Sequence, residues 1–269
     1  MYPFYYILIF SLSDSIEAAR GVTFLPRGFT LANYRLVFGI HGIARATAVS
    51  VVRTVSGTAI TLFACSFFAY LMTQQQMYFR KIVYRFMIVS MYVGAGLIPT
   101  FLVMRMYGLN NNFLIYILPG ALGAFNVILI KTYIEQLPPA LEEAAFIDGA
   151  GFFKIYAWVI YPLCMPINAT IIVFTSVGHW NEWFSSLIYM VGRPDLHVLQ
   201  FRLFELLTRT HGMVTAETDP ATLEQMVTRI TPETVRMTAT MIVTLPILFV
   251  YPFAQKFFIK GIMMGAVKG

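Results

Sequence analysis

The most regular feature of the chain is a series of long stretches without Asp, Glu, Lys or Arg. Five such windows hold between 19 and 27 residues each. Their apolar residues surround the helical wheel instead of forming one stripe, and a helix of about 20 mostly apolar residues crosses a hydrocarbon core. The pattern therefore predicts an all-α polytopic membrane protein. The windows run over Thr54–Phe79, Phe86–Met104, Met106–Ile130, Ile155–Asn181 and Met237–Gln255.

Turn residues between the windows predict six transmembrane helices in a single transmembrane domain, 1–269. The first helix is expected to be truncated in this sequence, because the apolar stretch Met1–Leu12 is too short to span. Pro and Gly inside the other helices are compatible with spans whose neighbours satisfy the freed backbone groups. The polar segment 192–232 is predicted as an extracytoplasmic loop. The remaining helices are predicted at about Ile43–Thr73, Ile82–Tyr107, Phe113–Leu137, Ile155–Val177 and Glu233–Ala254.

Composition and charge agree with this interpretation. Hydrophobic residues make up 58% of the chain and charged residues 12%, about half the share in soluble proteins. The mean hydropathy is +0.70. The formal net charge of +6 is spread over the ends of the apolar windows, as the positive-inside bias expects. Because the basic residues form no single patch and no aromatic-basic motif, nucleic acid is not an expected partner.

The sequence shows no arrangement that would support catalysis or metal binding, and we expect that the chain is not an enzyme. Both cysteines lie inside apolar windows, where buried free thiols are common. A Gly-x-x-x-x-Gly-Lys-Ser/Thr loop, which would cradle nucleotide phosphates, is absent from the sequence. The four histidines are scattered as His41, His179, His197 and His211.

One segment, 138–154, has the features of a short, sharply delimited cytoplasmic helix. Pro139 suits a first helical position, where its missing N–H costs nothing. Acidic residues in the first turn are favoured by the helix dipole. Gly149 can adopt the left-handed conformation that ends a helix. A short helix with a small-residue face, held between two membrane helices, would give another protein a rigid element to bind. Glu142 and Glu143 are the acidic residues of the first turn, Ala144 and Ala145 provide the face without bulk, and Phe146 and Ile147 provide an apolar contact.

The order Glu143-Ala144-Ala145, three residues, Gly149 and then Val159-Ile160-Tyr161-Pro162 resembles the EAA loop of binding-protein-dependent ABC importer permeases. The family pattern ends in Ile-x-Leu-Pro, so that Val159 and Tyr161 depart from it and Pro162 keeps it. The resemblance implies the type I permease fold and a coupling helix that docks on an ATPase subunit. The resemblance also implies which residues couple to the ATPase. They are Glu142, Glu143, Ala144, Ala145, Asp148, Gly149 and, in the C-terminal tail, Lys268 and Gly269.

Other short motifs resemble the carbohydrate-uptake branch of that family, typified by the maltose permease G subunit. Two of them also resemble a subgroup that imports complex or acidic oligosaccharides, including the second permease subunit of the alginate importer. The motifs of the branch are Asn33-Tyr34, Gly96-Leu97-Ile98-Pro99, Trp180-Asn181-Glu182-Trp183 and Gly265-Ala266-Val267-Lys268-Gly269, and those of the subgroup are Ile117-Leu118-Pro119-Gly120 and Tyr251-Pro252-Phe253-Ala254-Gln255-Lys256.

The resemblance also implies a set of partners for a protein of the bacterial inner membrane. These are a second, related but distinct permease chain, two ATPase subunits, an extracytoplasmic solute-binding protein and an oligosaccharide substrate. The chain itself would bind no cofactor, because ATP and Mg²⁺ would be held by the ATPase subunits. Transport would follow alternating access, with the coupling helices moving as the ATPases close.

Two groups of residues are candidates for the transport path. Trp180, Asn181, Glu182 and Trp183 offer aromatic faces and polar groups suited to sugars, although Trp also favours the membrane interface. Arg53 falls inside a predicted span, where a charge is costly and usually faces the bundle interior. It could bind an acidic substrate, pair with the companion permease, or extend toward the outer surface.

Three other kinds of membrane protein are alternatives: a self-contained secondary transporter, a membrane enzyme and a channel. A self-contained secondary transporter usually shows internal repeats and broken helices that meet at the midplane, and the sequence shows no clear repeat. A membrane enzyme would gather titratable residues near one face, which this chain does not do. A channel would have no reason for a capped cytoplasmic docking helix. Co-purification with an ATPase would separate an importer permease from all three.

Overall fold

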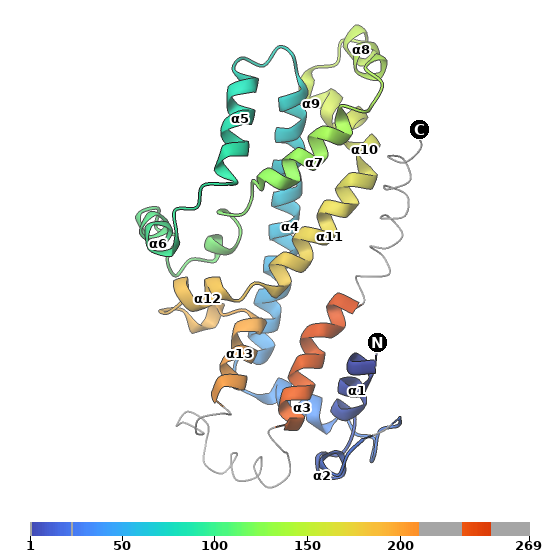
Figure 1. Ribbon diagram of the computed structural model, residues 1–269, viewed down its shortest axis with the longest axis vertical. Helices are drawn as coiled ribbons and strands as arrows, with labels where there is room; N and C mark the ends of the chain where they lie inside the picture. Colours follow the sequence, from blue (N-terminus) through green and yellow to red (C-terminus); the bar gives the residue numbers. More distant parts are fainter. Residues whose placement is uncertain (1, 23, 210–232, 249–269) are drawn as a thin grey trace. The chain divides into compact units, whose positions relative to one another are not determined.

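The computed structural model describes residues 2–22, 24–209 and 233–248, and within these ranges the chain forms helices and turns with no β-strand. The predicted all-α class is confirmed (Figure 1). The chain divides into two compact units. Unit 1 comprises Met1–Ser50 and Val191–Phe249, and unit 2 comprises Val51–Met190 and Val250–Gly269.

Unit 1 is built from two segments that lie far apart in the sequence. Its small core contains the buried side chains of Ile9, Phe10, Ala18 and Val22, and Met237 from the helical stretch 233–248 packs against them. Its other elements are α1 (Tyr2–Ser11), α2 (Ser15–Ala19), α3 (Ala32–Gly39), the first residues of α4, η3 (Pro194–Leu196) and α13 (Leu199–Arg209).

A buried asparagine joins α1 to α3 in unit 1. The Asn33 side-chain amide donates to the carbonyl oxygens of Ser11 and Ser13, at 3.0 and 2.8 Å. These carbonyls lie at the end of α1, where backbone acceptors lack helical partners. Asn33 is one of the residues that resemble the carbohydrate branch, and in this structure it satisfies buried backbone groups.

The long helix α4 (Ile43–Thr73) coincides with the predicted span and contains 31 residues. Within the described part of the chain it is the one helix that is by itself long and apolar enough to cross a membrane. A second crossing results if Phe152–Leu163 and Met165–Asn181 are taken as one span, bent by 82°.

Two predicted spans are interrupted, so the expectation of continuous helices there was wrong. The span predicted at Ile82–Tyr107 consists of α5 (Arg80–Ser90) and α6 (Leu97–Met106). Gly96 separates them with a φ of 79°, a conformation that glycine adopts without steric cost. The span predicted at Phe113–Leu137 consists of η1 (Phe113–Tyr116) and α7 (Ala124–Ile134), and Pro119, Gly120 and Gly123 lie in the gap.

The span predicted at Ile155–Val177 is also broken. Its elements are α9 (Phe152–Ile155), the π-helix η2 (Tyr156–Ile160), α10 (Tyr161–Leu163) and α11 (Met165–Asn181). The 82° bend falls at Cys164, between Pro162 and Pro166, each of which lacks the N–H that would continue a helix.

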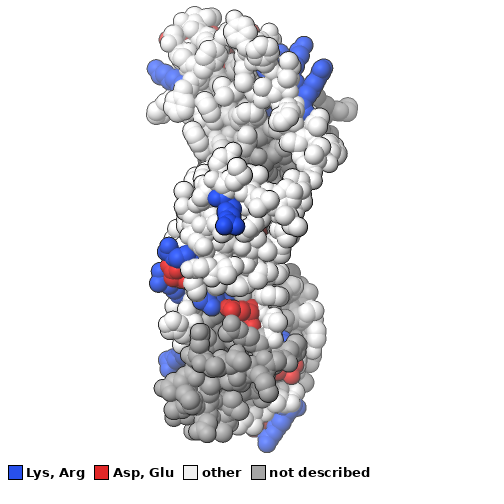
Figure 2. All heavy atoms as spheres, turned by 90° about the vertical axis from the view of Figure 1, so that its left-hand side faces the viewer, with Lys and Arg blue, Asp and Glu red and all other residues white. Residues whose placement is uncertain are grey.

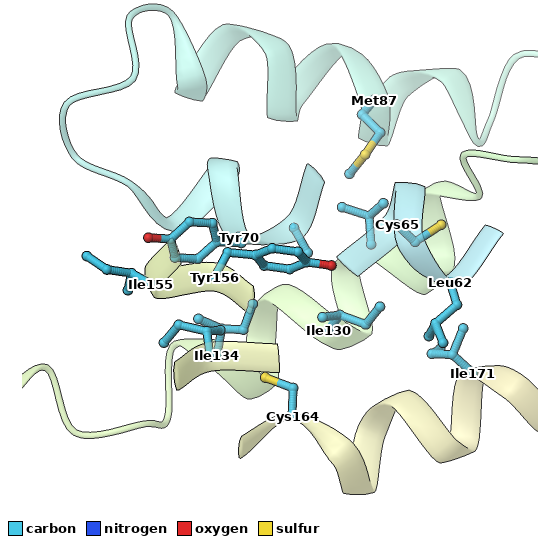
Figure 3. Close-up of a cluster of buried hydrophobic side chains, with 13 residues drawn as sticks. Leu62, Cys65, Tyr70, Met87, Ile130, Ile134, Ile155, Tyr156, Cys164 and Ile171 are labelled. Atoms are coloured by element: carbon cyan, nitrogen blue, oxygen red, sulfur yellow. The ribbon is translucent and has the colours of Figure 1, made fainter. Parts of the chain in front are cut away.

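The core of unit 2 lies between α4, α7 and the segment from α9 to α11. Tyr70, Ile130, Ile155 and Ile171 are completely buried there, and Figure 3 shows the rings of Tyr70 and Tyr156 side by side. The remaining elements of unit 2 are α8 (Ala140–Ile147) and α12 (Phe184–Tyr189). On the face drawn in Figure 2, uncharged residues cover most of the described surface, and Lys and Arg form separate groups.

Candidate functional site

Helix α8 lies inside the segment 138–154, in which a short helix is predicted, and Pro139 directly precedes its first residue instead of occupying the first helical position. It runs over Ala140–Ile147, with Pro139 at the N-cap. At the C-terminal end the N–H groups of Gly149 and Ala150 donate to the carbonyls of Phe146 and Ala145, both at 3.0 Å. Gly149 has a φ of 76°. These two hydrogen bonds form a Schellman motif, which fixes where α8 stops.

One face of α8 is open to its surroundings. Glu143, Ala144 and Asp148 are exposed, and they lie beside exposed apolar side chains. Ile147 has the most open of these, at 86% exposure. Ala145, in contrast, packs against the core of unit 2. The exposed face therefore combines negative charge with apolar surface on a helix whose other side is anchored.

The carboxylate of Glu142 turns toward α4 instead of toward solvent. Its Oε1 accepts a hydrogen bond from the Tyr70 hydroxyl at 3.0 Å and another from Gln74 Nε2 at 2.5 Å. The sequence interpretation grouped Glu142 with Glu143 and did not foresee this difference. The sequence carries no local signal for these contacts, because Gln74 follows the last residue of α4 and the donors lie 72 and 68 residues from Glu142.

An aromatic cluster supports this end of α4. The Tyr156 ring lies 5.1 Å from that of Phe67 and 5.7 Å from that of Tyr70. The Tyr156 hydroxyl forms a hydrogen bond of 2.7 Å with Ser66 Oγ. Tyr156 lies in the π-helix, a local widening that is frequent at functional sites. The end of α4 that carries the Tyr70 donor is therefore held in place by aromatic packing.

Arg53 and Glu182, two of the residues assigned to the transport path, form an ion pair in which Arg53 is buried and Glu182 is half-buried. Arg53 is only 3% exposed, and its Nη2 pairs with the Glu182 carboxylate. Its Nη1 donates to the backbone carbonyl of the same residue at 2.6 Å. The guanidinium also lies 4.5 Å from the centre of the Tyr116 ring, a cation–π distance. A pairing of Arg53 within this chain was not among the interpretations drawn from the sequence.

The carboxylate of Glu182 is itself held in place. Its Oε1 accepts a hydrogen bond from the Ser185 N–H at 2.7 Å. The Tyr116 hydroxyl and Ser186 Oγ lie 2.6 Å apart and form a hydrogen bond. The pair therefore joins α4 to the end of α11 and to the start of α12 through fixed groups.

The other proposed path residues lie next to the ion pair in sequence. Trp180 and Trp183 are half-buried and Asn181 is exposed. The Trp183 ring contacts that of Phe184, with centroids 5.9 Å apart. Contact of these residues with a sugar stays a prediction. The remaining predicted coupling residues, Lys268 and Gly269, lie outside the described residues.

The close approach of α4 and α11 beside the ion pair depends on a glycine. A Cβ atom added at Gly57 would lie 2.6 Å from Nε2 of His179, far inside van der Waals contact. We expect Gly57→Ala to displace the imidazole and to destabilise the protein by about 1–3 kcal/mol, the usual cost of overpacking. Thermal unfolding of the purified membrane protein measures this.

The matched control for that substitution is Gly178→Ala in α11. A Cβ there has no neighbour within 4 Å, and Ala is the better helix former. Gly178→Ala should keep or slightly raise the unfolding temperature. If both variants lost the same amount of thermal stability, the contact with His179 would not be the reason that residue 57 must be glycine.

The described part of the 192–232 loop belongs to unit 1 and contains a small charge network. Asp195 lies between Arg193 and Arg45, at 2.9 and 3.1 Å. The hydrogen bond from Arg193 lowers the pKa of Asp195 to about 2, so this carboxylate stays ionised at any physiological pH. Nearby, the Leu199 N–H donates to Ser50 Oγ at 2.8 Å, which joins α13 to α4.

The described residues contain no group of three or more His, Cys, Asp or Glu side chains that could hold a metal ion. Cys65 and Cys164 are free and buried. Among the described residues, three features are therefore candidates for a function. They are the exposed face of α8, the hydrogen bonds that hold Glu142 to the end of α4, and the ion pair of Arg53 with Glu182.

Comparisons with known proteins agree with one another. Residues 65–264 match the family described as binding-protein-dependent transport system inner membrane component, a family of transport proteins and not of catalysts. Protein LplC of Bacillus subtilis (strain 168) is 36% identical, over 99% of this chain and 89% of that protein. The polygalacturonan/rhamnogalacturonan transport system permease protein YtcP of the same organism is 32% identical, over 99% and 92%.

A solved structure is similar over nearly the whole fold. It is a crystal structure of a bacterial ABC transporter involved in the import of the acidic polysaccharide alginate. The TM-score is 0.85 at 29% identity, with 96% of this chain and 90% of that chain covered. The chain belongs to the family of binding-protein-dependent transport system inner membrane components, as a permease subunit with the type I fold of ABC importers.

Proposed function

We propose that the chain forms half of the translocation path of an ATP-driven importer in the bacterial inner membrane, and that the importer carries oligosaccharides of acidic sugars. Two similarities support the substrate class. One relative is named for the transport of polygalacturonan and rhamnogalacturonan, which contain uronic acids. The solved structure with a TM-score of 0.85 belongs to an importer of the acidic polysaccharide alginate.

The observation that carries the coupling function is the exposed face of α8. Glu143, Ala144 and Asp148 offer negative charge, and Ile147 adds an apolar contact. The Schellman motif at Gly149 satisfies backbone carbonyls at the C-terminal end of α8 and so keeps this end of the helix from unwinding. A helix with one anchored side and one open, amphipathic side is suited to dock in a cleft of an ATPase subunit. Lys268 and Gly269 are proposed as a second contact with the ATPases.

The proposed cycle requires four kinds of partner. Two ATPase subunits bind ATP and Mg²⁺ and close on each other, and each takes one coupling helix along. A second, related permease chain provides the other half of the path. An extracytoplasmic binding protein delivers the oligosaccharide. This chain binds no cofactor, and its part is to convert the displacement of α8 into a change of which side the path faces.

Substrate-stimulated ATP hydrolysis tests the proposal. The chain is reconstituted with its second permease, the ATPases and the binding protein, and is challenged with alginate oligosaccharides, oligogalacturonides and maltooligosaccharides. We expect stimulation by one or both acidic classes and none by the neutral class. Stimulation by maltooligosaccharides alone would contradict the acidic substrate while leaving an importer of sugars.

A further inference from the structure

Two neighbouring carboxylates of α8 have different surroundings. Glu143 is exposed. Glu142 is half-buried, and one of its carboxylate oxygens accepts from both the Tyr70 hydroxyl and Gln74 Nε2. Tyr70 lies in the last turn of α4, and Gln74 directly follows that helix. Hydrogen bonds to an ionised acceptor are roughly twice as strong as neutral ones. Glu142 is thus bonded to α4, whereas Glu143 stays open to a partner.

The two donors have little freedom to follow an independent movement of α8. Tyr70 is completely buried and its ring packs against that of Tyr156. Tyr156 is bonded in turn to Ser66, one helical turn before Tyr70 on α4. Gln74 is buried as well. A buried polar group that loses its partner is costly, so the bonded arrangement is strongly preferred.

We propose that Glu142 is a positioning residue that makes α8 and the end of α4 move as one body. The inference rests on the proposed function, in which α8 docks on an ATPase subunit. Displacement of α8 by the ATPase is then carried directly into α4. Glu143 makes the contact with the ATPase. Glu142 does not touch the ATPase and instead transmits the movement of α8 to α4.

The variant Glu142→Gln tests this tie, because it keeps the size of the side chain and removes the charge. An amide that faces the Gln74 amide and the Tyr70 hydroxyl can no longer serve as acceptor for both at full strength. Combining Glu142→Gln with Gln74→Glu exchanges the amide and the carboxylate between the two positions. The double variant keeps both the net charge and the possibility of a charge-assisted hydrogen bond.

The measurement is the distance between nitroxide labels at Leu141 of α8, which lies outside the proposed docking contact, and Val55 of α4. Both residues are exposed, whereas native Cys65 and Cys164 are buried. It is made on the complete complex, without nucleotide and after trapping with ATP and vanadate. In the wild type we expect one distance that does not change on trapping. Loss of a bond to a charged group changes a local equilibrium by about tenfold or more. Glu142→Gln should therefore show a second population that depends on nucleotide.

The double variant should restore the single, nucleotide-independent distance. A merely structural role of Glu142 would not produce a nucleotide-dependent distance, nor its rescue by exchange. If Glu142→Gln keeps the wild-type distance in both states, or if the exchange fails to restore it, the tie is overturned. Failure of the proposed function gives a different result. The ATPase subunits would then not bind the wild-type complex through α8, and Glu143→Gln would bind them as well as the wild type does.

Discussion

Reversing the charge at Glu143 is expected to separate ATP hydrolysis from transport. Glu143 is exposed on the open face of α8, next to Ala144 and Asp148. The substitution Glu143→Arg places a long cation where the proposed ATPase cleft meets an acidic helix. Losing one partner of a charged contact at an interface costs about 2–5 kcal/mol, or more than about thirtyfold in affinity. Transport should fall by at least that factor.

The measurement combines co-purification of the ATPase subunits with substrate-stimulated ATP hydrolysis in proteoliposomes. The control is Glu17→Arg in α2, an equal change of charge at an exposed residue whose partner, Arg20, is also exposed. Surface pairs of this kind contribute about 0–1 kcal/mol, so the control should transport normally. Normal coupling in Glu143→Arg would exclude Glu143 from the docking contact.

Removing the charge of Glu182 is expected to destabilise the fold. Arg53 is 3% exposed and would stay buried without its counter-charge. Its Nε already has no hydrogen-bond partner. Breaking a buried pair by removing one partner costs about 3–5 kcal/mol. Because the Glu182 side chain keeps 35% exposure, we expect a loss near the lower end for Glu182→Gln.

A double variant distinguishes a stranded charge from lost packing. A buried charge without its partner is the main cost of breaking such a pair, and Arg53→Met removes the charge that Glu182→Gln leaves unpaired, so the combination should recover most of the stability. Glu135→Gln is the matched control, since Glu135 pairs with Lys131 at 2.5 Å but is half exposed. Thermal unfolding in detergent provides the comparison. A Glu182→Gln protein as stable as the Glu135→Gln protein would show that the pair does not hold α4 to α11.

Local sequence signals predicted the elements that depend on neighbouring residues. The bounds of α4 agree with the predicted span, most of which lies in the charge-free window Thr54–Phe79, and those of α8 agree with start and stop signals at Pro139 and Gly149. The breaks at Gly96 and Cys164 were not predicted, because membrane helices accept Gly and Pro without ending. Whether such a residue bends a helix or interrupts it is decided by the neighbours that satisfy the freed backbone groups.

The contacts that define the candidate site could not be predicted from the sequence. Arg53 and Glu182 are separated by 129 residues, and Tyr70 and Glu142 by 72. No periodicity relates positions so far apart, and each residue alone supports several roles. Glu142 and Glu143 are the clearest case, since identical neighbours in the sequence face opposite surroundings in the structure.

Unit 1 combines two segments that lie far apart in the sequence, and this has a consequence for biosynthesis. Ile9 and Phe10 are covered in part by Met237, which the ribosome adds more than two hundred residues later. At translation rates of about 5–20 residues per second, this delay is on the order of tens of seconds. During that time α1 has no native partner from the helical stretch 233–248. Its apolar surface must be sheltered by lipid or by the insertion machinery until the last helix arrives.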